Sequence, residues 1–349
     1  MSDRSAIKAV GLFSGGLDSM LAVCLMREQG IEVTALHMRT GFSYEERSRI
    51  AGRVAASNPL EAERFAAQLG VPLEVIDISE AYLPMVLHPR FGYGSGLNPC
   101  VDCRILLLRT AKAWMEAHGY HFVFTGEVVG QRPKSQMRPT LNTVERESGL
   151  QGYLLRPLSA RLLKPTIPEL RGWVDRERLG AIAGRGRREQ MALAQRFGLR
   201  EYAQPFGGCC YLIDQAYARR LRDFLAREGG AALNREHVQL LAVGRHLRLP
   251  AGHKVIVGRN ERENEALASA AVEGLRLTTV DHPGPTALLL GTAGPAEIEL
   301  AAQITAGYSD GAAAPSVRVA IQASPGLAEG GCMIEVAPLA RERIRAMMV

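Results

Sequence analysis

The chain has 349 residues, of which 47% are hydrophobic and 22% are charged, a composition typical of a globular protein with room for two domains. It contains no apolar run of about 18 residues or more, and its N-terminus lacks the apolar core of a signal peptide. These features argue against a membrane protein and predict a cytoplasmic location. The net charge of +6 is compatible with a polyanionic partner.

The first predicted unit is a strand, a tight turn and a helix. KAVGLF is short and apolar, which predicts a buried strand, and LDSMLAVCLMREQG has apolar residues at helical spacing. Ser14-Gly15-Gly16 therefore lies on a strand-to-helix turn, where the backbone can approach an anion and the helix N-terminus offers free N–H groups. The turn lacks the Gly-Lys-Ser/Thr ending of a Walker A loop. We expect a phosphate-binding turn of another kind.

Strands and helices alternate along the first half of the chain, which predicts an α/β fold with a doubly wound parallel sheet. Strands are expected over 31–38, 71–78 and 120–127, and helices over 58–70, with Asn58 as N-cap, and over 103–119. Ligands of such sheets bind beyond the carboxyl ends of the strands. The turns at Ser14, after His37 and at Gly126 are therefore expected to line one crevice.

The composition changes near residue 229. Residues 226–234 are typical of a linker or a turn, and the short apolar runs that follow, with a helical stretch at 296–307, predict a second, smaller α+β domain. We expect one domain over residues 1–228 and another over 229–349.

The stretch SGGLDS resembles the signature of the PP-loop ATP pyrophosphatases, which split ATP between the α and β phosphates and adenylate a substrate. The resemblance implies that Ser14, Gly15, Gly16 and Ser19 bind pyrophosphate. It also implies that Asp18 orients Mg²⁺ or a water bound to it.

In this family the adenine is held by the backbone after the second strand, which corresponds here to Leu36, His37 and Met38. TGEVVGQRPKSQ, residues 125–136, is similar to a stretch of the tRNA 4-thiouridine synthetases, and LLRPLS, residues 154–159, continues that likeness. It implies contacts with ATP from the following residues: Gly126, Gly130, Gln131, Ser135 and Gln136.

Six cysteines in a chain expected to be cytoplasmic indicate metal or catalytic use rather than disulfides. Cys100 and Cys103 lie three apart at the start of a predicted helix, where the helix N-terminus and Arg104 favour the thiolate. Cys209 and Cys210 follow two glycines in FGGCCYLID. Three thiolates suit a [4Fe–4S] cluster or an open zinc site, and the same residues suit persulfide chemistry, in which one cysteine carries sulfur and another resolves it.

PP-loop enzymes of tRNA thiolation are of two kinds, and one kind binds a cluster through a Cys-x-x-Cys pair and one later cysteine. The resemblance therefore favours a [4Fe–4S] cluster on Cys100, Cys103 and Cys209, with Cys210 as the alternative third ligand. The same three cysteines and Asp18 are the predicted catalytic residues.

The C-terminal part carries a second resemblance. GHKVIVGRNERENEAL, residues 252–267, and EIELAAQITAGYSD, residues 297–310, are similar to the RNA-binding module of NFACT proteins. The resemblance implies an RNA-binding domain over 229–349. We expect Lys254, Arg259 and Arg262 to contact RNA phosphates.

Together the resemblances imply ATP-dependent thiolation of a uridine in tRNA, with 4-thiouridine preferred and 2-thiouridine second. ATP adenylates the base, and sulfide or a cysteine persulfide then displaces AMP. The implied partners are tRNA and a sulfur donor, either sulfide or the persulfide of a cysteine desulfurase; no membrane partner is expected, and a homodimer remains open. One alternative is a PP-loop amide ligase that adenylates a carboxylate and holds structural zinc. The other is a non-catalytic RNA-binding protein with a degenerate nucleotide site.

Overall fold

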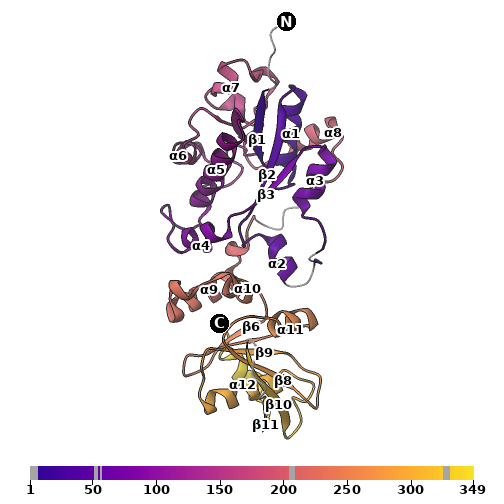
Figure 1. Cartoon of the computed structure of the whole chain (residues 1–349), viewed down its shortest axis with the longest axis vertical. Coiled ribbons are helices and arrows are strands. Elements are labelled where there is room, and N and C mark those ends of the chain that lie inside the picture. Colours follow the sequence, from indigo (N-terminus) through magenta and orange to yellow (C-terminus); the bar gives the residue numbers. More distant parts are fainter. Residues whose placement is uncertain (1–6, 51–53, 56, 204–208, 325–330) are drawn as a thin grey trace. The chain divides into compact units, whose positions relative to one another are not determined.

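The computed structural model describes residues 7–50, 54–55, 57–203, 209–324 and 331–349. Their backbone, traced in Figure 1, forms two compact units. The N-terminal unit comprises the described residues of Met1–Gly41 and Pro59–Cys210, and the C-terminal unit comprises those of Phe42–Asn58 and Tyr211–Val349. The domain boundary expected between residues 228 and 229 stays a prediction.

The N-terminal unit is built on five parallel strands in the order β3-β2-β1-β4-β5, which confirms the predicted α/β sheet. The chain leaves β1 towards β2 and β3 and then crosses to β4 on the other side of β1. The strand order therefore reverses between β1 and β4, where ligands of such sheets bind. The strands are β1 (Lys8–Leu12), β2 (Glu32–Arg39), β3 (Leu73–Asp77), β4 (Phe122–Thr125) and β5 (Leu154–Leu155).

Helices cover both faces of this sheet (Figure 1), because alternate strand residues point to opposite sides. Ala9 and Phe122 pack with α1, α3 and α8, whereas their neighbours Val10 and Val123 pack with α5 and α6. The helices of the unit are α1 (Leu17–Glu28), α3 (Glu61–Leu69), α4 (Ser79–Leu87), α5 (Cys100–Ala117), α6 (Arg138–Ser148), α7 (Ile167–Leu170) and α8 (Arg188–Arg196).

One helix start differs from the sequence-based expectation. Asn58 was expected to cap the helix, but α3 begins at Glu61 and Leu60 occupies the N-cap position. The Glu63 carboxylate accepts the Leu60 backbone N–H at 2.6 Å, which satisfies a donor at the helix entrance. A side chain inside the first turn thus replaces the predicted Asn58 cap.

The C-terminal unit contains a six-stranded sheet in the order β11-β10-β8-β9-β7-β6, and its strand pairs are antiparallel. Helix α12 packs on the sheet through small residues such as Ala301 and Ala302, which are fully buried against Leu277 and Val319. This arrangement confirms the smaller α+β domain. Its strands are β6 (Arg245–Arg248), β7 (Lys254–Val257), β8 (Gly274–Thr279), β9 (Ala287–Leu290), β10 (Val317–Ser324) and β11 (Cys332–Val336).

The remaining helices belong to the C-terminal unit and are mostly short. They are α2 (Tyr44–Ile50), α9 (Gln215–Glu228), α10 (Arg235–Leu240), α11 (Glu261–Ala268), α12 (Pro295–Gly307) and α13 (Arg341–Arg345).

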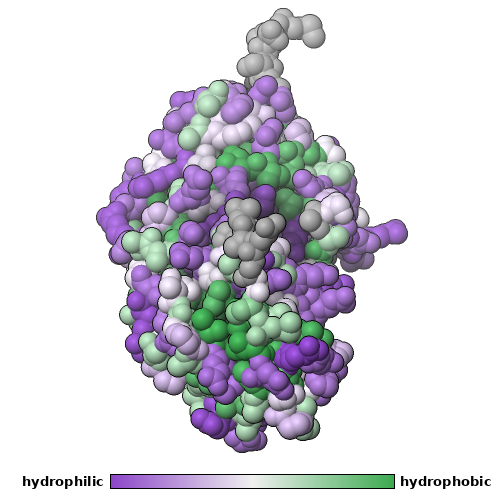
Figure 2. All heavy atoms as spheres, turned by 60° about the horizontal axis from the view of Figure 1, so that its bottom comes forward, coloured by the Kyte–Doolittle hydropathy of each residue, from purple (hydrophilic) through white to green (hydrophobic). Residues whose placement is uncertain are grey.

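None of the helices in the described residues combines the length and the apolar character that a membrane span needs. The most exposed large hydrophobic side chains are Leu170 at 73% and Met333 at 56%, in different units. Figure 2 shows hydrophobic areas bordered by hydrophilic residues on the face that it draws. Single exposed side chains such as Leu170 and Met333 are ordinary in folded proteins.

Lys254 was expected to contact an RNA phosphate, but the structure buries it in β7 with 1% of its surface exposed. Its ammonium group lies 2.6 Å from the Asp223 carboxylate in α9, and Arg248 contacts the same carboxylate at 2.6 Å. Lys254 therefore contributes to the fold of the C-terminal unit, and the phosphate contact assigned to it is wrong.

We expect Asp223→Asn to destabilise the chain by about 3 kcal/mol or more, because it leaves the buried Lys254 ammonium without its counter-charge. Asp281→Asn is the control, since its partner Arg318 lies on the surface and a much smaller loss is expected there. Urea unfolding of both full-length variants, followed by circular dichroism, measures the difference. Equal losses in the two variants would contradict a structural role for the buried pair.

Candidate active site

The turn between β1 and α1 has the geometry of an anion-binding turn. Gly15 adopts a positive φ of 75°, and a Cβ atom there would lie 2.8 Å from the Phe65 ring. Gly16 occupies the N-cap position and has no side-chain oxygen to cap α1, so the first N–H groups of the helix keep their capacity for an anion. The Ser14 hydroxyl is exposed beside them and accepts the Gly16 N–H at 3.4 Å, and Ser19 donates to the Gly16 carbonyl at 2.7 Å.

Asp18 presents a carboxylate oxygen that the described residues leave unsatisfied. Its Oδ2 accepts a hydrogen bond from Gln131 Nε2 at 3.0 Å. Its Oδ1 is buried and has no hydrogen-bond partner among the described residues. An unpaired buried carboxylate oxygen is costly, and Mg²⁺ is commonly held by one or two carboxylates together with substrate phosphates. Asp18 and the anion-binding turn therefore fit ATP and Mg²⁺.

Gly126, directly after β4, lies against the first turn of α1. A Cβ atom on Gly126 would be 2.5 Å from the carbonyl carbon and oxygen of Asp18 and 2.6 Å from the amide nitrogen of Ser19. The close approach of these two backbone segments is sufficient to require glycine here. The ends of β1 and β4 thus meet at the reversal point of the sheet.

Leu36, His37 and Met38, the predicted adenine contacts, lie in the second half of β2. The pairing of β1 with β2 ends at Leu12 and Leu36, so β2 continues beyond β1. The Phe13 N–H donates to the Leu36 carbonyl at 2.8 Å, and His37 Nδ1 lies 3.1 Å from the Phe13 carbonyl oxygen. These contacts fix the end of β2 to the anion-binding turn.

Two consecutive residues after Gly130 contact both predicted parts of the site. Gln131 donates to Asp18, and the guanidinium of the next residue, Arg132, lies near enough to the Cys209 sulfur to lower the pKa of Cys209. Neighbouring Cα atoms are about 3.8 Å apart. One loop therefore brings the anion-binding turn and the Cys209 sulfur to the same region of the N-terminal unit.

The same loop is closed by its own backbone. The Gly130 N–H donates to the Gln136 carbonyl at 2.7 Å, and Lys134 adopts a positive φ of 63° that non-glycine residues rarely adopt. Ser135 and Gln136 were expected to face ATP, but only 5% and 2% of their surfaces are exposed. Gln136 Oε1 has no hydrogen-bond partner among the described residues, and the ATP contacts expected of Ser135 and Gln136 stay predictions.

Cys103 and Cys209 influence each other and have opposite pKa shifts. Burial, together with the negative charge of Cys209, raises the pKa of Cys103 to about 12. A hydrogen bond from Cys210 lowers the pKa of Cys209 well below its ordinary value, and the charges of Arg132 and Arg104 act in the same direction. Cys209 is exposed, whereas Cys210 is buried. The lowered pKa favours the thiolate form of Cys209, and the raised pKa favours the protonated form of Cys103.

The predicted iron–sulfur ligand set does not form in the described part of the chain. No three His, Cys, Asp or Glu side chains there are placed to hold a metal ion, although Cys100, Cys103 and Cys209 are all described. Each sulfur has other partners. Asn98 Nδ2 donates to Cys100 Sγ at 3.0 Å, and the Tyr82 hydroxyl forms a hydrogen bond with Cys103. In the described residues the three sulfurs are thus not arranged around a single metal ion, and the [4Fe–4S] cluster stays a prediction.

A buried ion-pair network that sequence reasoning missed lies beneath the site. Glu127 is 2% exposed, and its carboxylate lies 3.1 Å from Arg156 Nε and 3.5 Å from Arg104 Nε. Arg156 also contacts Glu145 at 3.1 Å. The network joins the TGE stretch, the Arg-Pro-Leu stretch and the helix that carries Cys103. The only signal in the sequence is that charged residues stand inside otherwise apolar stretches.

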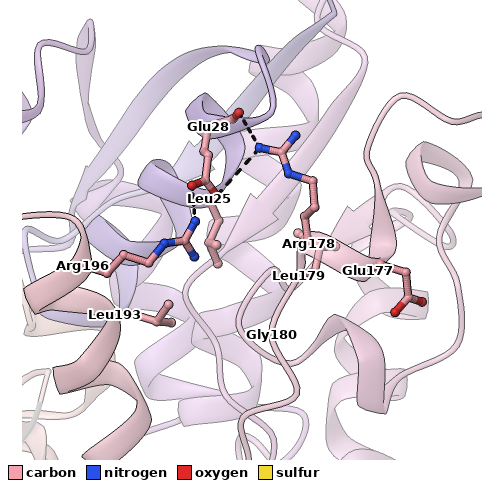
Figure 3. A pocket seen from close by; sticks show the side chains of 8 residues that line it. All are labelled: Leu25, Glu28, Glu177, Arg178, Leu179, Gly180, Leu193 and Arg196. Atoms are coloured by element: carbon pink, nitrogen blue, oxygen red, sulfur yellow. Dashed lines mark hydrogen bonds and ion pairs between the residues drawn. The ribbon is translucent and has the colours of Figure 1, made fainter.

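A cavity of about 330 Å³ lies at the C-terminal end of α1, the opposite end from the anion-binding turn. Figure 3 shows Arg178 and Arg196 pointing toward Glu28 from two different segments. Both guanidinium groups form ion pairs with the Glu28 carboxylate. The segment 171–200 is rich in arginine, and two of its arginines are thus neutralised within the unit.

We expect Glu127→Gln to cost about 3 kcal/mol or more at pH 7, because Arg104 and Arg156 lose a buried counter-charge. Burial alone would raise the pKa of Glu127, but the two arginines outweigh it and lower the pKa. The contribution of the carboxylate is therefore complete above the unfolded pKa of about 4.3 and disappears as pH falls through the lower folded pKa.

Urea unfolding of wild type and Glu127→Gln between pH 3 and pH 7 measures this contribution. Glu147→Gln is the control, because its partners Arg90 and Arg146 are exposed. We expect the Glu127→Gln difference to shrink below about pH 4. A difference that is small at pH 7, or independent of pH, would contradict the buried ionised pair.

Two family profiles match different parts of the chain. The family profile described as "tRNA methyl transferase HUP domain" matches residues 7–186, and the profile described as "NFACT protein RNA binding domain" matches residues 244–348.

Two curated relatives have the name tRNA-specific 2-thiouridylase MnmA. The protein of Geotalea uraniireducens is 27% identical over 238 residues, which cover 65% of this chain and 58% of the relative. The protein of Acidithiobacillus ferrooxidans is 29% identical over 238 residues, which cover 66% and 61%. The chain thus spans about six tenths of the length of these relatives.

A solved 4-thiouridine synthetase–RNA complex with bound ATP matches with a TM-score of 0.34 and 20% identity, over 60% of this chain and 45% of that chain. This similarity is too low to carry an argument. The first profile, in contrast, spans more than half of the 349 residues and includes the anion-binding turn, Gly126 and Cys103. The chain belongs to the family of the tRNA methyl transferase HUP domain.

Proposed function

We propose that this chain is an ATP-dependent tRNA sulfurtransferase that adenylates a uridine carbonyl oxygen and replaces it with sulfur. The observation that carries the proposal is the loop in which Gln131 contacts Asp18 and Arg132 contacts Cys209. The family match, the thiouridylase names of the relatives and the RNA-binding profile over residues 244–348 support it.

In the first step, ATP lies with its phosphates on the turn Ser14–Gly16 and its adenine at the end of β2, near Leu36–Met38. The uridine carbonyl oxygen attacks the α-phosphorus, the bond to the bridging oxygen breaks, and pyrophosphate leaves. Asp18 would hold Mg²⁺, which would neutralise charge on the phosphates. Asp18 is suited to this role because its Oδ1 is buried without a partner in the described residues.

In the second step, Cys209 carries the sulfur and Cys103 resolves it. The Cys209 thiolate takes a sulfur atom from the persulfide of a cysteine desulfurase. The terminal sulfur attacks the activated carbon of the base, and AMP leaves with the electron pair of the C–O bond. Cys103 then attacks the Cys209 sulfur, which leaves sulfur on the base and a disulfide between the two cysteines; an external thiol reduces the disulfide.

The opposite pKa shifts of the two cysteines favour this order. Cys209 is the accessible thiolate and therefore the better first nucleophile. The negative charge of Cys209 contributes to the raised pKa of Cys103. Once the Cys209 sulfur is uncharged, that contribution disappears, so Cys103 releases its proton to solvent more readily. Cys210 is buried and is the weaker candidate for the sulfur carrier.

The cluster remains the alternative sulfur route, with sulfide as the nucleophile and Cys100, Cys103 and Cys209 as ligands. The missing ligand group in the described residues counts against it. An anaerobic preparation that is colourless and free of iron supports the persulfide route, and a brown preparation with bound iron and sulfide supports the cluster.

The names of the relatives support 2-thiouridine as the product. The TGEVVGQ stretch, which predicts 4-thiouridine, keeps that nucleoside as the alternative. Liquid chromatography separates the two isomeric nucleosides by their retention times, and mass spectrometry identifies them as thiouridines.

We expect the full-length chain, supplied with ATP, Mg²⁺, a tRNA transcript, cysteine and a cysteine desulfurase, to form one thionucleoside. Asp18→Asn should lower both pyrophosphate release and the thionucleoside about hundredfold, as expected when a group that stabilises developing charge is lost. Cys209→Ser should abolish the thionucleoside but keep pyrophosphate release.

Cys332→Ser is the matched control, because Cys332 is exposed in the C-terminal unit and has no proposed role. It should retain wild-type yield. A Cys209→Ser variant that still forms the thionucleoside, or a wild type that releases no pyrophosphate with tRNA present, would overturn the proposed reaction.

A further inference from the structure

A second cavity, of about 250 Å³, lies within the C-terminal unit. It is lined by Arg245 in β6, by Tyr308 after α12 and by Arg341 at the start of α13. Asn264 and Gly284 also line the cavity. The volume is below the range of pockets for drug-sized ligands, so it suits one small group.

Two arginines converge on one aromatic ring in this cavity. The guanidinium carbon of Arg245 lies 4.7 Å from the centroid of the Tyr308 ring, and that of Arg341 lies 4.4 Å from it. Both are cation–π contacts, which fix the position of a guanidinium group while leaving its N–H groups available. Two positive charges are thus held beside one ring.

Neither arginine is neutralised by a carboxylate. In the described part of the C-terminal unit, the ion pairs involve other residues, and Arg245 donates only to the Gly258 carbonyl, at 3.0 Å. Arg259, which also lines the cavity, is paired with Glu263. Asp310 on the wall offsets one charge, so the cavity keeps a net positive charge.

Two other residues that line the cavity, Asn264 and Gly284, add a hydrogen-bond donor and a tightly packed turn. Asn264 Oδ1 accepts the Thr286 N–H at 3.0 Å, which leaves the amide NH₂ group of Asn264 as a donor. A Cβ atom on Gly284 would lie 2.4 Å from the Thr279 hydroxyl, so the turn that carries Gly284 packs tightly beneath the cavity. Two guanidinium groups that form no ion pair in the described residues, together with an amide donor, suit an oxyanion with several acceptor oxygens.

We propose that Arg245 and Arg341 bind a backbone phosphate of the tRNA, with Tyr308 as the residue that positions both guanidinium groups. The inference rests on the proposed function, because it names the contact by which the C-terminal unit holds the same substrate. It takes the place of the contact predicted for Lys254, which is buried, while the contacts predicted for Arg259 and Arg262 stay predictions.

The test is binding of a tRNA transcript to the full-length chain at several salt concentrations. We expect the double variant R245Q/R341Q to bind about tenfold more weakly at physiological salt. Its plot of log affinity against log salt should be shallower by about 0.7 to 0.9, since the contact with one phosphate is lost. R343Q is the matched control, because Arg343 is exposed on the same helix and does not line the cavity.

Inorganic phosphate separates an RNA site from a site for a free anion. We expect phosphate to compete only at millimolar concentration, whereas micromolar binding of phosphate that R245Q/R341Q abolishes would assign a free-anion site and overturn the inference. Unchanged unfolding midpoints show that the variants are folded, and Tyr308→Phe, which keeps the ring, should bind like wild type.

The outcomes separate this inference from the proposed function. If wild type binds no tRNA, both fail. If wild type binds tRNA and forms the thionucleoside, but R245Q/R341Q loses no more affinity than R343Q, only the inference fails.

Discussion

Two adjacent side chains, Gln131 and Arg132, hold the candidate site together. The amide of Gln131 fixes the Asp18 carboxylate at the start of α1, and the guanidinium of Arg132 contacts the Cys209 sulfur. The anion-binding turn and Cys209 are far apart in the sequence, and this loop lies close to both. The loop follows β4, next to the point where the strand order reverses between β1 and β4. It lies close to the first turn of α1 because Gly126 packs directly on that turn.

The electrostatics of the site depend on the arginines around it. Arg104 contacts the buried Glu127 carboxylate and also lowers the pKa of Cys209, so one cation serves both the fold and the thiolate. Arg156 on the other side of Glu127 keeps that carboxylate ionised. A change at Glu127 is therefore expected to reach the cysteines through Arg104, although Glu127 itself has no part in the proposed chemistry.

The sequence predicted the features that depend on local pattern. Alternating strands and helices gave the parallel sheet, and glycine spacing gave the turn at Ser14–Gly16. Features that depend on distant partners were missed or wrong. Lys254 is charged and was expected on the surface. It is buried because it forms an ion pair with Asp223, which lies 31 residues earlier in the sequence. The spacing of Cys100 and Cys103 predicts metal ligands; the described residues hold no group of three ligands around one metal ion, and the predicted cluster is not confirmed.

The central claim is that bound nucleotide and Cys209 share one crevice, and alkylation of the full-length chain tests it most directly. Iodoacetamide at pH 6, with mass-spectrometric mapping, should modify Cys209 faster than Cys103, because the pKa of Cys209 is lowered and that of Cys103 is raised to about 12. A saturating non-hydrolysable ATP analogue should slow modification of Cys209 several-fold and leave that of Cys332 unchanged. An unchanged rate at Cys209, with binding of the analogue verified by calorimetry, would contradict the account.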